Sequence, residues 1–426
     1  MNTIYDLSGL GLSIGDHNIY VVGKAPNYKD SDPSNTVVYS ILPNIVISGL
    51  KASYRIGEEV AGISAIVEQT QEAVDYTING EDVTSYIPTK EDLENGVVVS
   101  ATFGGVTATA TAEVVNEVEV GDFDTLTAAV NAVGYEGLVK LSEDLDLADS
   151  AVEIGEGVKI TLDLNGFSIA GVNNGDIYVT GGDLTLIDSD ENSTGSIYAN
   201  SDYGTGHGSG LIAVREGVFT MNSGKIYAVR DDAVNKGQFG ITYGGITTAA
   251  TVNINGGTIT AGWYAVSSAG NFLPGSVLNI TGGTLVSTVD YAIYGPSNGI
   301  INVSGDATIV DGGAGAVCIN NGTINITGGN FASKGNGDTG TWENGTGGLG
   351  DVAVYLNARY GNSTANISGG LFVAERSAVD LKTGSAHTAT FNITGGVYSD
   401  DPSAFLTEGY TAVERADGKF EVVPAA

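Results

Sequence analysis

One short phrase that alternates apolar and polar residues recurs along the second half of the chain. It reads TVNINGG at residues 251–257 and returns as LNITGG, INVSGD, INITGG, ANISGG and FNITGG. An aliphatic residue follows the asparagine in each copy, and neighbouring residues of a strand point to opposite faces. We predict that the aliphatic residues stack inside the fold, while the asparagines form an outer polar ladder or bond the turn backbone. The aliphatic residues are Ile254, Ile280, Val303, Ile326, Ile367 and Ile393, and the asparagines are Asn253, Asn279, Asn302, Asn325, Asn366 and Asn392.

The spacing of the small residue that closes each phrase indicates the size of the repeating unit. These residues are Gly182, Gly224, Gly257, Gly283, Asp306, Gly329, Gly370 and Gly396, with gaps of 42, 33, 26, 23, 23, 41 and 26 residues. We interpret the shortest gap as the basic unit and the longer gaps as that unit plus a loop. A period of this length indicates a solenoid or a propeller.

Each unit contains three short strands: the asparagine strand, an apolar strand, and a strand with an Ala-Val or Ala-Ile pair. The pairs are Ala228–Val229, Ala265–Val266, Ala292–Ile293, Ala316–Val317, Ala353–Val354 and Ala378–Val379. A propeller blade needs four strands in about 40 residues, and a leucine-rich repeat has its own leucine spacing. We therefore predict an all-β chain whose residues 118–426 form a right-handed parallel β-helix of about 9–10 coils.

The ends of this β-helix have their own signals. Apolar residues recur at helical spacing in FDTLTAAVNAV, where Asp122 or Asp124 can cap the first turn. A helix here would cover the N-terminal end of the strand stack, and we expect the C-terminal cap to begin at about residue 398. The helical apolar positions are Phe123, Leu126, Val130 and Val133.

Two smaller β segments precede the repeats. The alternating pattern in residues 1–44 predicts a hairpin. Its strands, HNIYVVGKA and TVVYSI, flank the turn cluster YKDSDPSN. An isolated hairpin is marginal in water, so we expect it to dock onto a neighbouring domain or chain. Residues 45–117 predict a small β-sandwich that serves as a spacer or docking module. The alternating apolar positions of the hairpin, and hence its docking residues, are Ile19, Val21, Val37 and Tyr39.

Composition narrows the classes of partner. The chain has 17 Lys and Arg against 50 Asp and Glu, a net charge of −33, which argues against nucleic acid and against an anionic membrane surface. Its 63 glycines and 8 prolines indicate a turn-rich β protein. Cys318, the single cysteine, lies in the apolar run AGAVCIN and is expected to be buried. No motif predicts a metal or a cofactor, and the N-terminal residues lack a secretory signal.

Two short strings are weak candidates for catalysis. GHG at residues 206–208 and DDAV at residues 231–234 resemble fragments of the polygalacturonase active site, but in the reverse order. Glycosidases need two carboxylates at a defined separation, which Asp231 and Asp232 supply only if they face a groove, with His207 nearby. We expect no enzymatic activity.

Two long segments between repeats are candidates for ligand binding. Residues 188–210 and 333–350 are predicted to leave the coil, and long loops on a rigid scaffold often bind partners. Aromatic rings beside polar groups are typical of a sugar-binding surface, although the alternative is ordinary turn packing. The candidate residues are Tyr203, His207 and Trp342 in the loops, and Trp263 and Tyr264 at a nearby turn.

Several stretches carry a resemblance to known families. VKITLDLNGFSIAG, the NITGG phrases and the ending GGVYSDDPSAFLTEGYTAVERADGKFEVV resemble the pectin-lyase-like β-helix proteins of phage particles and bacterial surfaces, over residues 119–426. GDHNIYVVGKAPNYKDSDPSNTVVYS resembles the last two strands of immunoglobulin-like or fibronectin-III-like modules. The resemblance implies the fold but does not identify the function, because fibres, adhesins and polysaccharide-cleaving enzymes all share this fold.

These observations favour a structural protein of a phage virion, as a head fibre, capsid decoration or tail spike. Its N-terminal region would bind other capsid or tail proteins, and its β-helix would contact a glycan or protein of the host surface. Rods of this kind also form homotrimers. The alternatives are a fragment of a bacterial cell-surface adhesin and a polysaccharide depolymerase.

Overall fold

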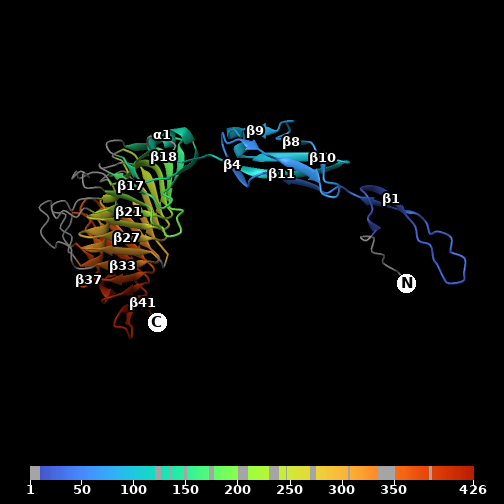
Figure 1. The fold of residues 1–426 in the computed structure, drawn as a ribbon. Coiled ribbons are helices and arrows are strands. Elements are labelled where there is room, and N and C mark those ends of the chain that lie inside the picture. Colours follow the sequence, from blue (N-terminus) through green and yellow to red (C-terminus); the bar gives the residue numbers. More distant parts are fainter. Residues whose placement is uncertain are drawn as a thin grey trace. The chain divides into compact units, whose positions relative to one another are not determined.

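The computed structural model divides the chain into two compact units, Met1–Asn116 and Glu117–Ala426 (Figure 1). The structure describes residues 10–119, 126–134, 136–147, 151–171, 177–199, 210–229, 239–245, 247–268, 275–305, 308–333, 351–382 and 386–426.

The first unit begins with a two-stranded hairpin and continues into small packed sheets. Strand β1 (Gly15–Ile19) pairs antiparallel with β2 (Val37–Ile41). A three-stranded sheet then packs on a four-stranded sheet through Ile45, Ala65 and Ala101. The first sheet contains β3 (Ile45–Ser48), β6 (Ser64–Val67) and β7 (Glu72–Ala73), and the second contains β4 (Ser53–Arg55), β8 (Tyr76–Ile78), β10 (Val97–Phe103) and β11 (Val106–Val115). The remaining short elements are β5 (Val60–Ala61), β9 (Ser85–Tyr86) and the 3-10 helix η2 (Lys90–Leu93).

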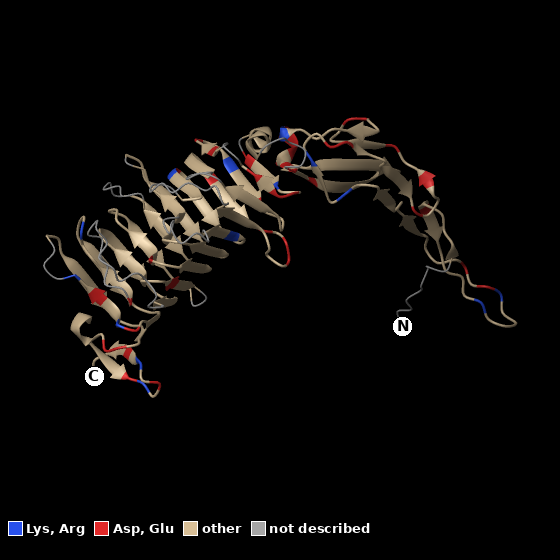
Figure 2. Cartoon of the chain, turned by 60° about the vertical axis from the view of Figure 1, so that its left-hand side comes forward, with Lys and Arg blue, Asp and Glu red and all other residues tan. Residues whose placement is uncertain are grey.

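The second unit is a stack of short strands in three columns, which we call columns A, B and C (Figures 1 and 2). Successive strands of a column pair in parallel, and the chain visits A, C and B in turn. Columns A and B belong to one sheet because β18 and β20 run continuously through both. The arrangement is consistent with a parallel β-helix, in agreement with the prediction from the repeat.

The strand bounds show how the columns are filled. Column A contains β12 (Glu117–Glu119), β13 (Glu136–Lys140), β16 (Lys159–Asp163), the second halves of β18 (Ile177–Ile187) and β20 (Ile212–Met221), β23 (Ala250–Ile254), β26 (Val277–Ile280), β29 (Ile300–Val303), β32 (Gly322–Ile326), β35 (Ser363–Ile367) and β38 (Ala389–Ile393). Column B contains β15 (Val152–Gly155), the first halves of β18 and β20, β22 (Phe239–Tyr243), β25 (Tyr264–Ser268), β28 (Tyr291–Gly295), β31 (Gly315–Ile319), β34 (Val352–Leu356) and β37 (Ser377–Leu381). Column C contains β14 (Leu145–Asp146), β17 (Ser168–Gly171), β19 (Ser196–Ala199), β21 (Lys225–Ala228), β24 (Thr258–Ala261), β27 (Thr284–Ser287), β30 (Ile309–Gly312), β33 (Asn330–Ser333), β36 (Leu371–Val373) and β39 (Val397–Tyr398).

The repeated aliphatic residues stack inside the unit, as predicted. Each is at most 1% exposed, and each lies in register with its counterpart in the next coil. Column C adds a stack of rings to the core, because Phe331, Phe372 and Tyr398 follow one another with ring centroids 4.9 Å apart. The interior is therefore a continuous apolar column.

The repeated asparagines form an outer ladder, which decides between the two predicted arrangements. The Nδ2 of Asn279 donates to the Oδ1 of Asn253 at 2.9 Å, and the same bond recurs up to Asn392 at 2.8 to 2.9 Å. At the other end Asn253 donates to the Thr220 hydroxyl at 3.3 Å. Six amides in successive coils thus point the same way.

Glycines at the corners allow the chain to turn sharply. Gly257 has a φ of +80°, and a Cβ there would lie 2.7 Å from the carbonyl oxygen of Gly224 in the preceding coil. Any side chain would therefore meet both backbone strain and a clash. This explains the second glycine of the repeated phrase.

Both ends of the stack are covered by other elements. Helix α1 (Leu126–Val133) buries Leu126, Val130 and Val133 against the first strands, whereas Asp122, Phe123 and Asp124 lie outside the described residues. At the other end η4 (Ser403–Phe405) leads into β40 (Tyr410–Glu414) and β41 (Phe420–Pro424), and β41 pairs antiparallel with β39.

One strand assignment from the sequence is wrong. Ala228 was grouped with the Ala-Val pairs, but it ends β21 in column C and pairs with Ala261. The column B strand of that coil is β22, which follows later in the chain. The other five pairs do align in column B.

Candidate functional site

The outward face of column B is buried, unlike an ordinary sheet surface. All five residues of β25, β31 and β34 are buried, so these strands are covered on both sides. One side faces the core, and the other carries a second apolar cluster of Tyr264, Tyr291, Ala314, Cys318, Val352 and Tyr355, with Phe239, Trp263 and Tyr294 packed against it. We call this cluster the aromatic face.

Four rings of the aromatic face pack against one another. The ring of Tyr264 lies between Phe239, at a centroid distance of 5.2 Å, and Tyr294, at 4.4 Å. Trp263 packs 5.9 Å from Phe239 and 6.2 Å from Tyr264, and it keeps partial exposure. Tyr264 therefore has both ring faces covered, whereas Trp263 is the half-buried member of the predicted pair.

A buried carboxyl group lies at the edge of the aromatic face. Asp290 is 6% exposed, and its Oδ1 accepts the backbone N–H of Tyr291 at 2.9 Å. Burial raises the pKa of Asp290 to about 6, although hydrogen bonds from Tyr291 and from the Tyr264 hydroxyl oppose the shift. A carboxyl group whose pKa lies near neutral pH can either accept or donate a proton.

The neighbouring titratable groups are held neutral. Burial raises the pKa of Tyr264, Tyr291 and Cys318 well above their usual values, and the charge of Asp290 adds to each shift. Cys318 is 1% exposed, which confirms the prediction from its apolar run. A buried, protonated thiol is a poor nucleophile, so Asp290 is the group of this cluster that can change charge near neutral pH.

Sequence reasoning missed Asp290, Phe239 and Tyr294. A signal was present, because Asp290 directly precedes the Ala-Ile strand YAIYG. It was not used, since nothing local indicates that this corner is buried. Of the predicted site residues, Tyr203, His207, Asp231, Asp232 and Trp342 lie outside the described residues.

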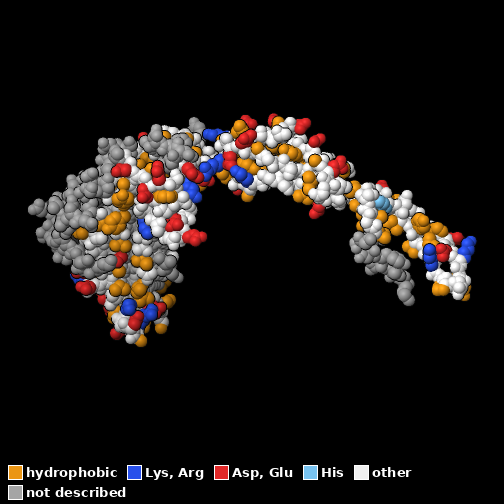
Figure 3. Space-filling view, in the orientation of Figure 1, with side chains coloured by type: hydrophobic (Ala, Val, Ile, Leu, Met, Phe, Trp, Pro, Cys, Tyr) orange, Lys and Arg blue, Asp and Glu red, His pale blue; other side chains and the backbone are white. Residues whose placement is uncertain are grey.

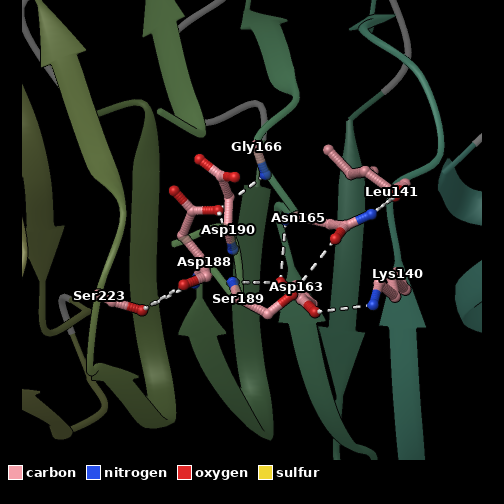
Figure 4. Close-up of polar contacts among 9 residues, drawn as sticks. All are labelled: Lys140, Leu141, Asp163, Asn165, Gly166, Asp188, Ser189, Asp190 and Ser223. Atoms are coloured by element: carbon pink, nitrogen blue, oxygen red, sulfur yellow. Dashed lines mark hydrogen bonds and ion pairs between the residues drawn. The ribbon is translucent and has the colours of Figure 1, made fainter. Parts of the chain in front are cut away.

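A second polar group lies where column A turns into column C (Figure 4). Asp163 accepts the backbone N–H groups of Asn165 and Ser189, both at 2.9 Å, and lies 3.9 Å from the Nζ of Lys140. Asp188 accepts the N–H groups of Gly166 at 2.8 Å and Gly195 at 2.7 Å. These carboxylates connect the corners of successive coils through hydrogen bonds, so their role is structural.

The same turn, which contains Asp188 and Asp190, also corrects a prediction. Residues 188–210 were expected to leave the coil, but Asp188 and Asp190 hold the chain in a tight turn up to Thr194, while residues 200–209 lie outside the described part of the chain. Residues Ser196–Ala199 then form β19, which pairs with β17 and β21. Backbone N–H groups that lack strand partners at a corner need acceptors, and the acidic residues supply them.

The hairpin of the first unit exposes the residues predicted to dock. Val37 is 65% exposed, Val21 44% and Tyr39 43%, while Ile19 is half-buried. Val21 lies beyond the end of β1, where its N–H donates to the Ser34 hydroxyl and its carbonyl accepts the Ser34 N–H, both at 2.9 Å. In the described part of the chain β1 and β2 form a sheet of two strands, so each has one unpaired edge.

The described residues contain no group of three or more His, Cys, Asp or Glu side chains placed to hold a metal ion. Among the same residues, no helix combines the length and apolar character needed to cross a bilayer.

No family model matches the sequence, and comparison with curated proteins and with solved structures gives no significant match.

Proposed function

We propose that this chain is a structural protein of a phage particle, as a head fibre, capsid decoration or tail spike. In this proposal the hairpin attaches the protein to the particle surface, residues 45–116 form an immunoglobulin-like spacer, and the stack is a right-handed β-helix that faces the host. Parallel strands joined by crossovers are right-handed in almost all proteins, which supports the handedness.

The observation that carries the proposal is the exposed hairpin. It presents large apolar side chains to solvent on a sheet that is too small to be stable alone. Among the described residues, each of its two strands pairs along one edge only. Addition of a strand from a partner would pair this backbone and cover the apolar side chains, as expected of a docking element.

The stack supports the second half of the proposal. A continuous apolar core and a hydrogen-bonded asparagine ladder make a stiff support, and rigid scaffolds commonly present binding residues to a partner. Trp263, a half-buried residue whose ring packs on Phe239 and Tyr264, is the described residue best suited to contact a host glycan.

Incorporation into particles tests the proposal. Deletion of residues 1–44 should abolish incorporation and leave the stack folded, because the stack has an apolar core of its own. Val37→Glu should reduce incorporation without unfolding the protein, since it places a charge on the docking surface. Val413→Glu is the matched control, because Val413 is also an exposed strand valine, at 48%. Normal incorporation of the deletion variant would reject the proposal.

A further inference from the structure

Two asparagines occupy the same position in consecutive coils, just beyond the end of column B. Asn320 follows β31 and Asn357 follows β34. Ile319 lies opposite Leu356 in the paired strands, and the backbone N–H of Asn357 donates to the carbonyl oxygen of Ile319 at 2.8 Å. The two asparagines are therefore separated by one strand spacing, about 4.8 Å. Both are completely buried, at 0% exposed.

Three polar atoms of this asparagine pair have no hydrogen-bond partner in the described part of the chain. They are the Oδ1 of Asn320 and both the Oδ1 and the Nδ2 of Asn357. The fourth atom, the Nδ2 of Asn320, lies 3.7 Å from the Sγ of Cys318, which is a weak acceptor. An unpaired buried polar group is costly to the folded state, so such groups nearly always pair with the protein or with ordered water. The asparagine pair therefore indicates a binding site for a further group.

Direct bonding between the two amides does not account for these three atoms. In the outer ladder of column A, amides of consecutive coils bond directly at 2.8 to 2.9 Å. Asn320 and Asn357 lie on strands paired in the same way and make no such bond. One bond from the Nδ2 of Asn357 to the Oδ1 of Asn320 would leave the Oδ1 of Asn357 unpaired, because the Nδ2 of Asn320 is directed at Cys318. The site therefore takes a molecule that donates two hydrogen bonds and accepts one.

The surroundings of the asparagine pair limit the size of that molecule. The β34–β35 connection lies against Asn320, where the backbone N–H of Tyr360 donates to the Asn320 carbonyl oxygen at 3.0 Å. Ala358, in the same connection, is 0% exposed. Cys318 and Tyr355, which lie two residues before the two asparagines, are each 1% exposed. A molecule enclosed by these residues must be small.

The donors and acceptors of the site limit the charge of that molecule. The Nδ2 of Asn357 presents hydrogens and disfavours a cation, while the two amide oxygens disfavour an anion. The net charge of −33 also disfavours an anion, and Figure 3 shows Asp and Glu side chains at the surface of the chain. Water both donates and accepts, and a buried water typically makes about three hydrogen bonds to groups that are otherwise unpaired. Water is therefore the ligand that fits the site.

We propose that Asn320 and Asn357 bind an ordered water molecule. The water donates to the Oδ1 of each asparagine and accepts a hydrogen bond from the Nδ2 of Asn357, so it connects two coils where the chain leaves column B. It also fixes the start of the β34–β35 connection. Ala358, the next residue, has a φ of +45°, a left-handed conformation that a residue with a side chain keeps only when its surroundings fix it. Tyr360 in this connection bonds the Tyr294 hydroxyl of the aromatic face. The inference does not depend on the function proposed for the chain.

A crystal structure of the full chain tests the site without any substitution. We expect one water molecule within about 2.7–3.2 Å of all three unpaired amide atoms. Magnetic relaxation dispersion of the solvent counts long-lived buried waters in solution, and Asn357→Leu should lower this count by one. Asn325→Leu is the matched control and should leave the count unchanged, because the Asn325 amide bonds both of its neighbours directly.

Substitution also tests whether the two asparagines act through a shared partner. Asn320→Leu and Asn357→Leu should each raise the equilibrium constant for unfolding by about 10-fold, because each variant leaves a polar atom of the other asparagine unpaired. The double variant should raise this constant by much less than the product of the two single effects, since it leaves neither atom. Chemical denaturation measures the constants, and circular dichroism confirms that each variant is folded.

Three results would overturn the proposal. The first is a crystal structure in which the two amides bond each other with no water between them, or a water count that Asn357→Leu leaves unchanged. The second is an ion or another solute at the site. The third is a pair of single variants that are each more stable than the wild type and whose effects multiply, since the two amides would then be buried without any partner.

Discussion

The carboxyl group of Asp290 is costly to the fold at neutral pH. Its pKa in the folded chain is about 6, above the ordinary value of 3.8, because burial disfavours the charged form. The folded state therefore binds the proton more tightly than the unfolded chain does. Protonation of Asp290 thus stabilises the folded state. This contribution to stability is complete below about pH 4 and is lost as the pH rises through about 6.

Replacing Asp290 by asparagine should remove this pH dependence. Asn can still accept the Tyr291 N–H, and its amide can donate to the Tyr264 hydroxyl. We expect Asp290→Asn to unfold with the same free energy as the wild type near pH 4, and to be more stable by about 3 kcal/mol at pH 7.5. Chemical denaturation at the two pH values measures the difference.

An exposed carboxylate provides the control for Asp290. A hydrogen bond from Lys419 lowers the pKa of Asp417, so neutralising Asp417 removes a favourable interaction. Asp417→Asn should therefore give no gain in stability at pH 7.5. An Asp290→Asn variant whose advantage was the same at both pH values would show that Asp290 does not titrate in this range.

At the scale of the strand, the asparagine ladder couples each coil to the next. An amide in the middle of the ladder donates to one neighbour and accepts from the other, whereas Asn392 at the end only donates to Asn366. Because successive strands already pair through their backbones, the ladder adds a second, side-chain connection along the stack.

Position within the ladder should set the cost of losing an asparagine. Asn325→Ala removes two hydrogen bonds and leaves groups of Asn302 and Asn366 without their ladder partners. We expect a loss of about 1–2 kcal/mol of unfolding free energy for Asn325→Ala. Asn392→Ala removes one exposed bond and should cost less than half as much. Equal losses of unfolding free energy for the two variants would show that position in the ladder does not set the cost.

At the scale of the whole molecule, the two units have separate cores. The core of the first unit draws its residues from Ile14 to Val114, and the core of the second draws its residues from Val118 to Val422. The second unit is built from contacts between consecutive coils, so its stability accumulates along the stack. The first unit instead depends on strand pairs that close small sheets.

Separate cores predict that each unit folds alone. Fragments 1–116 and 117–426 should each unfold cooperatively, with melting temperatures within about 3 °C of the two transitions of the full chain. Differential scanning calorimetry of the fragments and of the full chain makes the comparison. A fragment 117–426 that failed to fold would show that the first unit contributes to the stack.

The interior of the stack could be predicted from the repeated phrase. Strict alternation places Ile254 and its counterparts on one face and Asn253 and its counterparts on the other, whatever the rest of the chain does. The closing glycine is likewise local, because Gly257 adopts a conformation that other residues avoid. The spacing of the phrases then indicated how many residues make one coil.

The aromatic face and Asp290 could not be predicted from the sequence, because they depend on contacts between coils that no local pattern contains. Ala228 precedes a valine like the column B alanines, but its column depends on where the rest of that coil returns to the stack. Tyr264 alternates like a surface residue and is buried because Phe239 and Tyr294 come from the coils before and after it. Asp290 gains its raised pKa from the same packing. Alternation depends on the backbone of one strand, whereas burial of the outward face depends on residues distant in sequence.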